Sequence, residues 1–169
     1  MTPQQIKDIL SSFMFLKNKY GEQNILLSKK GRWVGGGHEQ DISLIDPDRI
    51  SSVTLRTASG NVLLNVAAFN NIGLTILDIK NAYLQVFLPE DLDIHVRIDK
   101  HVVKILQRLD PSIIPFIDSN GEVYAKLNKA LYGLVQSAKL WYEDLCRKFA
   151  QIGYFPCSNN IDPCMLVKD

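Results

Sequence analysis

The stretch that most constrains the fold runs from Leu74 to Tyr83, Leu-Thr-Ile-Leu-Asp-Ile-Lys-Asn-Ala-Tyr. Four apolar or β-branched residues lead straight into Asp78, which predicts a buried strand that ends in a carboxylate. The Lys-Asn-Ala-Tyr-Leu that follows favours a helix. Because α/β enzymes bind ligands at the carboxyl ends of strands, Asp78 is a candidate metal ligand that calls for a second acidic partner.

The segments before Asp78 predict a hairpin and a helix. Residues 1–10 favour a short helix with Pro3 in its first turn. Residues 11–34 read as two strands joined by Gly21-Glu-Gln-Asn24, and the run Gly35-Gly-Gly37 permits a sharp redirection. Over residues 55–70 the apolar positions recur at three and four, which predicts a helix with one apolar face: Leu55, Ala58, Val62, Val66 and Phe69.

The segments after Asp78 alternate between strands and helices. Strands are expected over 94–98 and 122–127, with a helix over 100–109 capped by Asp99. A long helix follows residue 137, and ion pairs four residues apart are expected on it, Glu143 with Arg147 and Asp144 with Lys148. A final strand opens near Cys164. This order predicts an α+β fold with a mixed or antiparallel sheet and packed helices.

Composition excludes several classes of protein. The 169 residues suffice for one domain, and the net charge of +1 means that any nucleic-acid binding must rely on local patches. Three dispersed cysteines suggest neither a disulfide framework nor a zinc site, which favours a reduced, intracellular setting. No apolar run reaches the ~18 residues of a membrane span, so no membrane partner is expected.

Lys29, Lys30 and Arg32 form a basic cluster on the second hairpin strand. From the residues alone the cluster is either a solvated strand face or a phosphate-binding arm. His95 and His101 have no second ligand at a metal-binding spacing, so both are interpreted as structural.

Several segments together resemble copia-type retrotransposon reverse transcriptases. Residues 77–84, Leu-Asp-Ile-Lys-Asn-Ala-Tyr-Leu, are similar to the first catalytic motif of that family. Residues 126–142 resemble its most distinctive block, Lys-Leu-x-Lys-(Ala/Ser)-Leu-Tyr-Gly-Leu-Lys-Gln-Ser-Pro-Arg-x-Trp, and residues 30–37 are similar to its Lys-Ala-Arg-Leu-Val-Ala-x-Gly. The resemblance runs in register from about residue 11 to the end of the chain.

The resemblance implies the partial fingers and palm of a right-handed polymerase that copies an RNA or DNA template-primer from deoxynucleoside triphosphates. Residues 1–10 would be an N-terminal extension, residues 11–73 a fingers-like hairpin and helix, and residues 74–169 a partial palm, incomplete at the C-terminus. Such enzymes use two Mg²⁺ ions.

The resemblance also implies roles for individual residues. Asp78 would be the catalytic carboxylate that bridges the metals, and the Ile79 carbonyl would serve the nucleotide-side ion. Lys30 and Arg32 would hold the incoming triphosphate, and Tyr83 would lie at its sugar. Three further residues would lie near the nucleotide and the template base: Tyr132, Gly133 and Gln136.

The sequence departs from the family in one large respect: the 169 residues contain no Tyr-x-Asp-Asp motif and no other pair of adjacent aspartates. One carboxylate and one carbonyl do not hold two mutually repelling Mg²⁺ ions in fixed geometry. We therefore expect the chain by itself to lack polymerase activity, with the remaining polymerase half as a missing partner. A non-catalytic nucleic-acid-binding remnant and a protein-interaction remnant stay open as alternatives.

Overall fold

The computed structural model describes residues 9–157 and 162–168. The order of elements is β1 (Ile9–Tyr20), β2 (Leu26–Gly35), α2 (Thr57–Phe69), β3 (His95–Ile98), α3 (Lys100–Leu109), β4 (Val123–Lys126), α4 (Ser137–Ala150), β5 (Tyr154–Pro156) and β6 (Leu166–Lys168). Short 3-10 turns lie between them, for example at Tyr83–Gln85 and Pro111–Phe116. The expected α+β class is confirmed.

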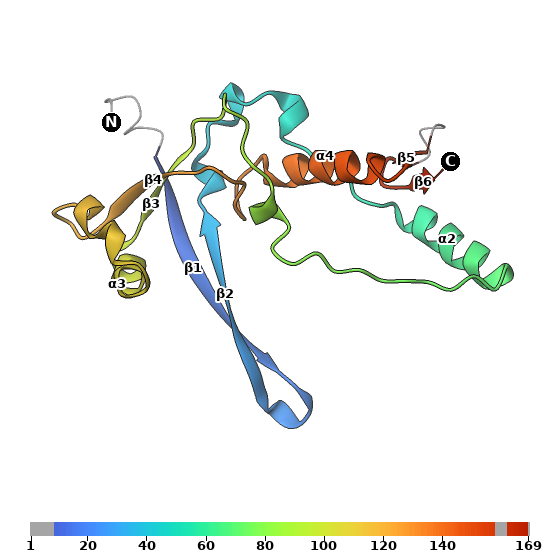
Figure 1. The fold of residues 1–169 in the computed structure, drawn as a ribbon, viewed down its shortest axis with the longest axis horizontal. Coiled ribbons are helices and arrows are strands. Elements are labelled where there is room, and N and C mark those ends of the chain that lie inside the picture. The colour runs from blue at the N-terminus through green and yellow to red at the C-terminus, as the bar shows by residue number, and fades with distance from the viewer. Residues whose placement is uncertain (1–8, 158–161, 169) are drawn as a thin grey trace.

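The main sheet has the strand order β2-β1-β3-β4. β1 runs antiparallel to β2 and parallel to β3, and β3 runs antiparallel to β4, so the sheet is mixed, as expected. Only Ile9–Ser12 of β1 pairs with β3. The rest of β1 pairs with β2 alone, and the two strands leave the sheet as a long arm (Figure 1).

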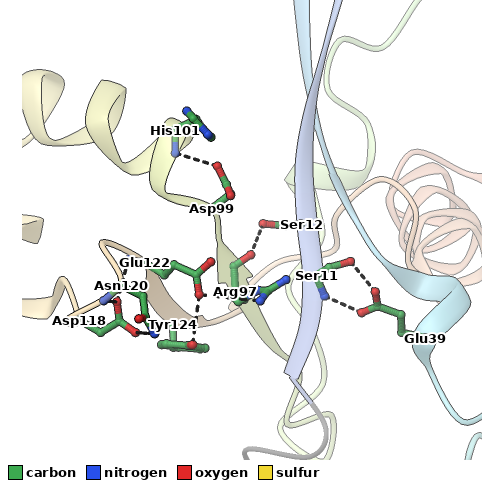
Figure 2. A network of polar contacts seen from close by, with 10 residues as sticks. All are labelled: Ser11, Ser12, Glu39, Arg97, Asp99, His101, Asp118, Asn120, Glu122 and Tyr124. Atoms are coloured by element: carbon green, nitrogen blue, oxygen red, sulfur yellow. Dashed lines mark hydrogen bonds and ion pairs between the residues drawn. The ribbon is translucent and has the colours of Figure 1, made fainter.

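Polar contacts hold the base of β1 in place (Figure 2). The Ser11 amide and hydroxyl both donate to the Glu39 carboxylate at 2.6 Å, and Ser12 Oγ donates to the Arg97 carbonyl at 2.7 Å. The hydrogen bonds from Ser11 lower the pKa of Glu39 below its ordinary value of 4.5. These bonds join the residues after β2 to β1 and join β1 to β3.

The hydrophobic core lies around β3, where it contacts β1, β4, α3 and the segment before α4. One cluster of buried residues comprises Leu10, Ile94, Val96, Leu131 and Leu134, and a second comprises Ile98, Val103 and Val123. Trp33 of β2 packs against both clusters, so it links the arm to the core. The indole nitrogen of Trp33 is buried without a hydrogen-bond partner among the described residues.

The helices after Asp78 begin as the sequence predicts. Asp99 accepts a hydrogen bond from the His101 amide at 2.7 Å and caps α3. On α4 one of the two expected ion pairs is confirmed, with Lys148 Nζ 2.7 Å from Asp144 Oδ2. The expected Glu143–Arg147 pair is wrong: Arg147 reaches Asp144 at 2.9 Å, because that buried carboxylate attracts both cations, and Glu143 contacts Lys139 instead.

The strand predicted to lead into Asp78 is absent from the described residues. Residues 72–79 are extended but belong to no sheet, and Ile76 and Leu77 are 95% and 81% exposed. The helix expected after Asp78 is also wrong, because Lys80 and Asn81 form a turn, with Asn81 at φ +53°, before the short 3-10 turn. Extended backbone becomes a strand only where a neighbour pairs with it, and no described residue does so here.

The helix predicted over residues 55–70 is confirmed as α2 (Thr57–Phe69), and much of its apolar face is exposed. Val62, Val66 and Phe69 are 57%, 49% and 91% exposed. Figure 1 shows α2 at the opposite end of the molecule from α3. Residues 72–79, which follow α2, belong to no helix or strand. Amphipathic spacing therefore predicted the helix correctly, while the surface that would cover its apolar face is missing from the described residues.

The ends of the chain depart from expectation in smaller ways. The helix expected over residues 1–10 lies mostly outside the described residues, and Ile9 and Leu10 belong to β1. The final strand is confirmed but begins at Leu166, and it pairs with a strand at Tyr154–Pro156 that the sequence did not predict. Among the described residues, no helix is long and apolar enough to cross a membrane.

Asp162 caps α2 from a distant part of the chain. The N-cap residue Arg56 supplies no side-chain cap, but its amide donates to Asp162 Oδ2 at 2.8 Å, and the Cys164 amide donates to Oδ1 at 2.9 Å. The Arg56 amide and, to a smaller degree, the Ser59 hydroxyl and the Cys164 amide lower the pKa of this buried carboxyl below its ordinary 3.8. A carboxylate also complements the positive end of the helix dipole.

This arrangement predicts an acid-sensitive contact. Because the pKa of Asp162 is lower in the folded than in the unfolded chain, its ionised form stabilises the fold above pH 3.8, and this contribution is lost as the pH falls through the folded pKa. Asp162→Asn should lower the melting temperature at pH 7, with a difference that shrinks below pH 3.8. The exposed Asp48→Asn is the control, and a difference independent of pH would contradict the prediction.

Candidate functional site

A pocket of about 590 Å³ brings together residues that are far apart in the sequence. Its walls come from β2, from the turn after Asp78 and from the segment before α4. Five of the eight residues predicted for the site line it: Lys30, Arg32, Asp78, Ile79 and Tyr132. The volume lies within the range of about 300–1,000 Å³ that small-molecule sites occupy.

Lys30 and Arg32 reach the pocket from alternate positions of β2. Residues two apart on a strand share one face, so both cations lie on the same side of the arm. Both are exposed, and among residues 9–157 and 162–168 neither forms an ion pair with a carboxylate. Two uncompensated cations in one pocket favour an anionic ligand.

Asp78 lines the same pocket and lies at the end of the extended segment. It is exposed, and the turn that follows is held by a hydrogen bond from Gln85 Nε2 to the Lys80 carbonyl at 2.8 Å. No group of three or more His, Cys, Asp or Glu side chains that could hold a metal ion occurs in the described parts of the chain. Asp78 therefore enters the pocket without a second carboxylate.

Aromatic rings connect the two walls of the pocket. Tyr83 and Tyr132 pack in a tilted arrangement with ring centroids 4.8 Å apart. The Arg32 guanidinium lies 5.9 Å from the centroid of the Tyr132 ring, within the range of a cation–π contact. The three side chains form a row, so Tyr83 joins the pocket residues through Tyr132 although it does not line the pocket itself.

Gly133 and Gln136 are placed outside the pocket. Gly133 has φ +91°, and a Cβ at this position would overlap the Gly35 carbonyl oxygen. Gln136 is buried, with 2% of its surface exposed, and its Oε1 accepts a hydrogen bond from Gln40 Nε2 at 3.0 Å. In this arrangement Gly133 lies against the end of β2, and Gln136 bonds to a residue that follows β2.

Sequence reasoning missed the residues that make this junction. The Gly35 amide donates to the Tyr132 carbonyl at 2.8 Å, and the Val135 amide donates to Gln40 Oε1 at 2.9 Å. A Cβ on Gly37 would overlap the Gly133 carbonyl oxygen. The signal in the sequence was the run Gly35-Gly-Gly37, which indicated a close approach of backbone without naming its partner.

Known proteins with similar sequences agree on the family. The family described as reverse transcriptase (RNA-dependent DNA polymerase) matches residues 1–163, so the match includes residues 1–10, which the resemblance did not cover. The chain is 29% identical over 153 residues to the "Retrovirus-related Pol polyprotein from transposon RE1" of Arabidopsis thaliana. It is 26% identical over 153 residues to the corresponding polyprotein from transposon RE2 of the same plant.

Each of these alignments covers 90% of this chain but 9% of the polyprotein. The chain thus spans less than a tenth of the length of these curated relatives. No solved structure matches it. The family match extends over nearly the whole chain, through the hairpin, the Asp78 segment and the block before α4. The chain belongs to the reverse transcriptase (RNA-dependent DNA polymerase) family.

Proposed function

We propose that the pocket between β2 and Asp78 is the nucleotide end of a reverse-transcriptase site, within a partial fingers and palm. One observation carries the proposal: Lys30 and Arg32 line the same pocket as Asp78, although more than forty residues separate them in the sequence. The reaction that the family name describes is RNA-templated DNA synthesis, and its substrate is a deoxynucleoside triphosphate. Membership of the family and the charge of the pocket both support this substrate class.

In this proposal the cations and the aromatic rings bind different parts of the nucleotide. The planar Arg32 guanidinium suits a phosphate group through two parallel hydrogen bonds, and Lys30 adds a second positive charge on the same strand face. The Tyr83 and Tyr132 rings offer flat apolar surface for a sugar or a base. The resemblance also connects Gly133 and Gln136 with the nucleotide. According to this proposal, the two residues contribute by holding Tyr132 in place.

The donor set of the pocket does not fit two Mg²⁺ ions. Asp78 is the single carboxylate among the residues that line the pocket, and the Ile79 carbonyl is a neutral candidate ligand. Mg²⁺ requires near-octahedral oxygen coordination, and two such ions repel each other strongly. These residues alone therefore support no metal-dependent step. The proposal for this chain is binding of the nucleotide, and primer extension by the purified 169 residues with Mg²⁺ is expected to be undetectable.

Substitution of Arg32 tests the proposal. Loss of a charge-assisted hydrogen bond is worth about 1.5–3 kcal/mol, so Arg32→Ala should weaken binding of a fluorescent deoxynucleoside triphosphate about 10-fold or more. Arg32→Lys should recover part of the affinity, because it restores the charge without the bidentate geometry. Arg147→Ala is the control, since Arg147 is equally cationic but ion-paired with Asp144 on α4. Equal affinities for the parent and Arg32→Ala would refute the proposal.

A further inference from the structure

Two cysteines that are eighteen positions apart in the sequence, Cys146 and Cys164, lie on either side of one tyrosine. Tyr142 and Cys146 are one helical turn apart on α4, so both project from the same face of the helix. The Tyr142 hydroxyl donates to the Pro163 carbonyl at 2.8 Å, and Pro163 directly precedes Cys164. The face of α4 that carries Cys146 therefore lies against the turn that carries Cys164. Figure 1 shows β5 and β6 beside the C-terminal end of α4.

The electrostatic environment of these side chains agrees with that placement. Burial, a hydrogen bond with the Cys146 thiol and the nearby thiols of Cys146 and Cys164 raise the pKa of Tyr142 to about 12. Burial, the Asp162 carboxylate and the Cys146 thiol raise the pKa of Cys164 above its ordinary 9.0. Both cysteines are only partly buried, so a small thiol reagent in solution reaches them.

Backbone hydrogen bonds fix the turn that carries Cys164. The Met165 amide donates to the Asp162 carbonyl at 3.0 Å and closes the turn over residues 162–165. The Asp162 side chain accepts hydrogen bonds from the Cys164 amide and from the Arg56 amide at the start of α2. The third cysteine, Cys157, is held by its amide, which donates to the Met165 carbonyl at 2.9 Å. Cys164 is therefore fixed relative to both α4 and α2.

We propose that Cys146 and Cys164 form a dithiol site that closes to a disulfide under oxidising conditions. With glutathione disulfide as the oxidant, the thiolate of one cysteine attacks a glutathione sulfur and releases one glutathione thiolate. The thiolate of the other cysteine then attacks the protein sulfur of this mixed disulfide and releases the second glutathione. The two protein thiols lose two protons and two electrons, and these reduce one glutathione disulfide to two glutathione molecules.

The disulfide joins α4 to the turn that caps α2. In a reducing compartment the glutathione pool keeps both thiols free, so the bond forms only when the compartment becomes oxidising. Neither cysteine lines the pocket that contains Asp78. The inference therefore goes beyond the proposed nucleotide binding and does not depend on it.

The test incubates the folded 169-residue chain with glutathione disulfide, blocks the remaining thiols with N-ethylmaleimide and digests the product with trypsin. We expect Cys146 to be linked to Cys164, and Cys157 to carry the maleimide. Trypsin leaves Cys157 and Cys164 in one peptide, residues 149–168, so fragmentation spectra must assign the bond. Cys157→Ser should form the same bond at the same rate. The rate should rise as the pH increases through 9.0, because the thiolate is the nucleophile and the pKa of Cys164 is raised.

The same chain unfolded in urea is the matched control. Loop closure in an unfolded chain favours the cysteines that are closest in sequence. Cys157 and Cys164 are seven positions apart, Cys146 and Cys157 eleven, and Cys146 and Cys164 eighteen. We therefore expect the Cys157–Cys164 bond to predominate in urea and the Cys146–Cys164 bond to predominate in the folded chain.

The disulfide should also change the stability of the fold. Because it closes a loop of eighteen positions, oxidation should raise the melting temperature by about 5 °C or more, and dithiothreitol should reverse the shift. Cys146→Ser and Cys164→Ser, treated in the same way, should form no disulfide within the folded chain and should show no such shift.

Three results would overturn the proposal. The first is a folded chain whose thiols all stay free in glutathione disulfide above pH 9.0. The second is a bond from Cys157 in place of the Cys146–Cys164 bond, and the third is a Cys146–Cys164 bond that forms no more readily in the folded chain than in urea. A chain that forms this bond but binds no deoxynucleoside triphosphate would contradict the proposed function alone.

Discussion

Gly133→Ala is expected to lower the free energy of unfolding by about 3 kcal/mol or more, a large part of the total stability of about 5–15 kcal/mol of a typical domain. Two causes add. Gly133 has φ +91°, where a residue with a Cβ is strained, and the new methyl group would overlap the Gly35 carbonyl oxygen and contact the Val34 side chain. Neither neighbour can withdraw, because both belong to β2.

The same substitution should weaken nucleotide binding in molecules that remain folded. Tyr132 is held by the hydrogen bond from the Gly35 amide and by its bridge to Val34, both of which depend on the close approach at Gly133. A shift there moves the Tyr132 ring away from Arg32 and Tyr83. We expect the affinity for a deoxynucleoside triphosphate to fall together with stability.

Substitutions at two other glycines separate the effect of backbone strain from that of steric overlap. Gly121 has φ +82°, but the nearest atom to its added Cβ would be 3.5 Å away, so Gly121→Ala should cost only the backbone term, about 1 kcal/mol. Gly73 has no atom within 4 Å of an added Cβ, and Gly73→Ala should leave stability nearly unchanged. Urea unfolding monitored by circular dichroism measures all three, and equal costs at Gly133 and Gly121 would contradict the proposed overlap.

We expect the chain to self-associate, and Ile76→Lys together with Leu64→Lys should then give a monomer of about 19.1 kDa without loss of stability. Between Arg56 and Asp78 the sequence has no charged residue. Much of the apolar surface in this stretch is exposed, on α2 and on the unpaired segment after it. Exposed apolar surface of this extent, next to backbone that lacks strand partners, favours association between copies.

The expected change in unfolding free energy for the double variant is within about 0.5 kcal/mol per site, because Ile76 and Leu64 are 95% and 53% exposed. Val96→Lys is the contrasting variant: Val96 is fully buried in the sheet, so a lysine there should cost about 4 kcal/mol or more. Light scattering coupled to size exclusion gives the mass, and thermal unfolding gives the stability. Unfolding by Ile76→Lys would indicate that residues 72–79 are buried as a strand.

The segments that the sequence predicted well are those with local causes. The α3 helix begins where Asp99 caps it, and the hairpin turns at Gly21–Asn24. The ion pair of Asp144 with Lys148 follows from spacing within one helix. Each of these features depends on groups within a few residues of one another, so the local sequence contains both of the interacting groups.

The failures occurred where the partner lies elsewhere in the chain. The apolar run before Asp78 has the composition of a buried strand, but strand formation requires a pairing neighbour, and the described residues supply none. The spacing in α2 predicted an apolar face correctly, but no pattern within the helix could show that much of this face is exposed. Asp162, which caps α2 across 106 residues, gave no signal, because a long-range cap has no fixed spacing.

The sequence by itself determined the family, the α+β class and the identity of the residues proposed for the site. It could do so because motif residues and local patterns lie at neighbouring positions along the chain. Only the tertiary structure decided which of those residues meet. It gathers Lys30, Arg32 and Asp78 around one pocket, moves Gln136 into a buried hydrogen bond with Gln40, and sets Lys17 opposite Lys30. Strand register and the close approach of glycine backbones are properties of chain segments in contact, and no single segment encodes them.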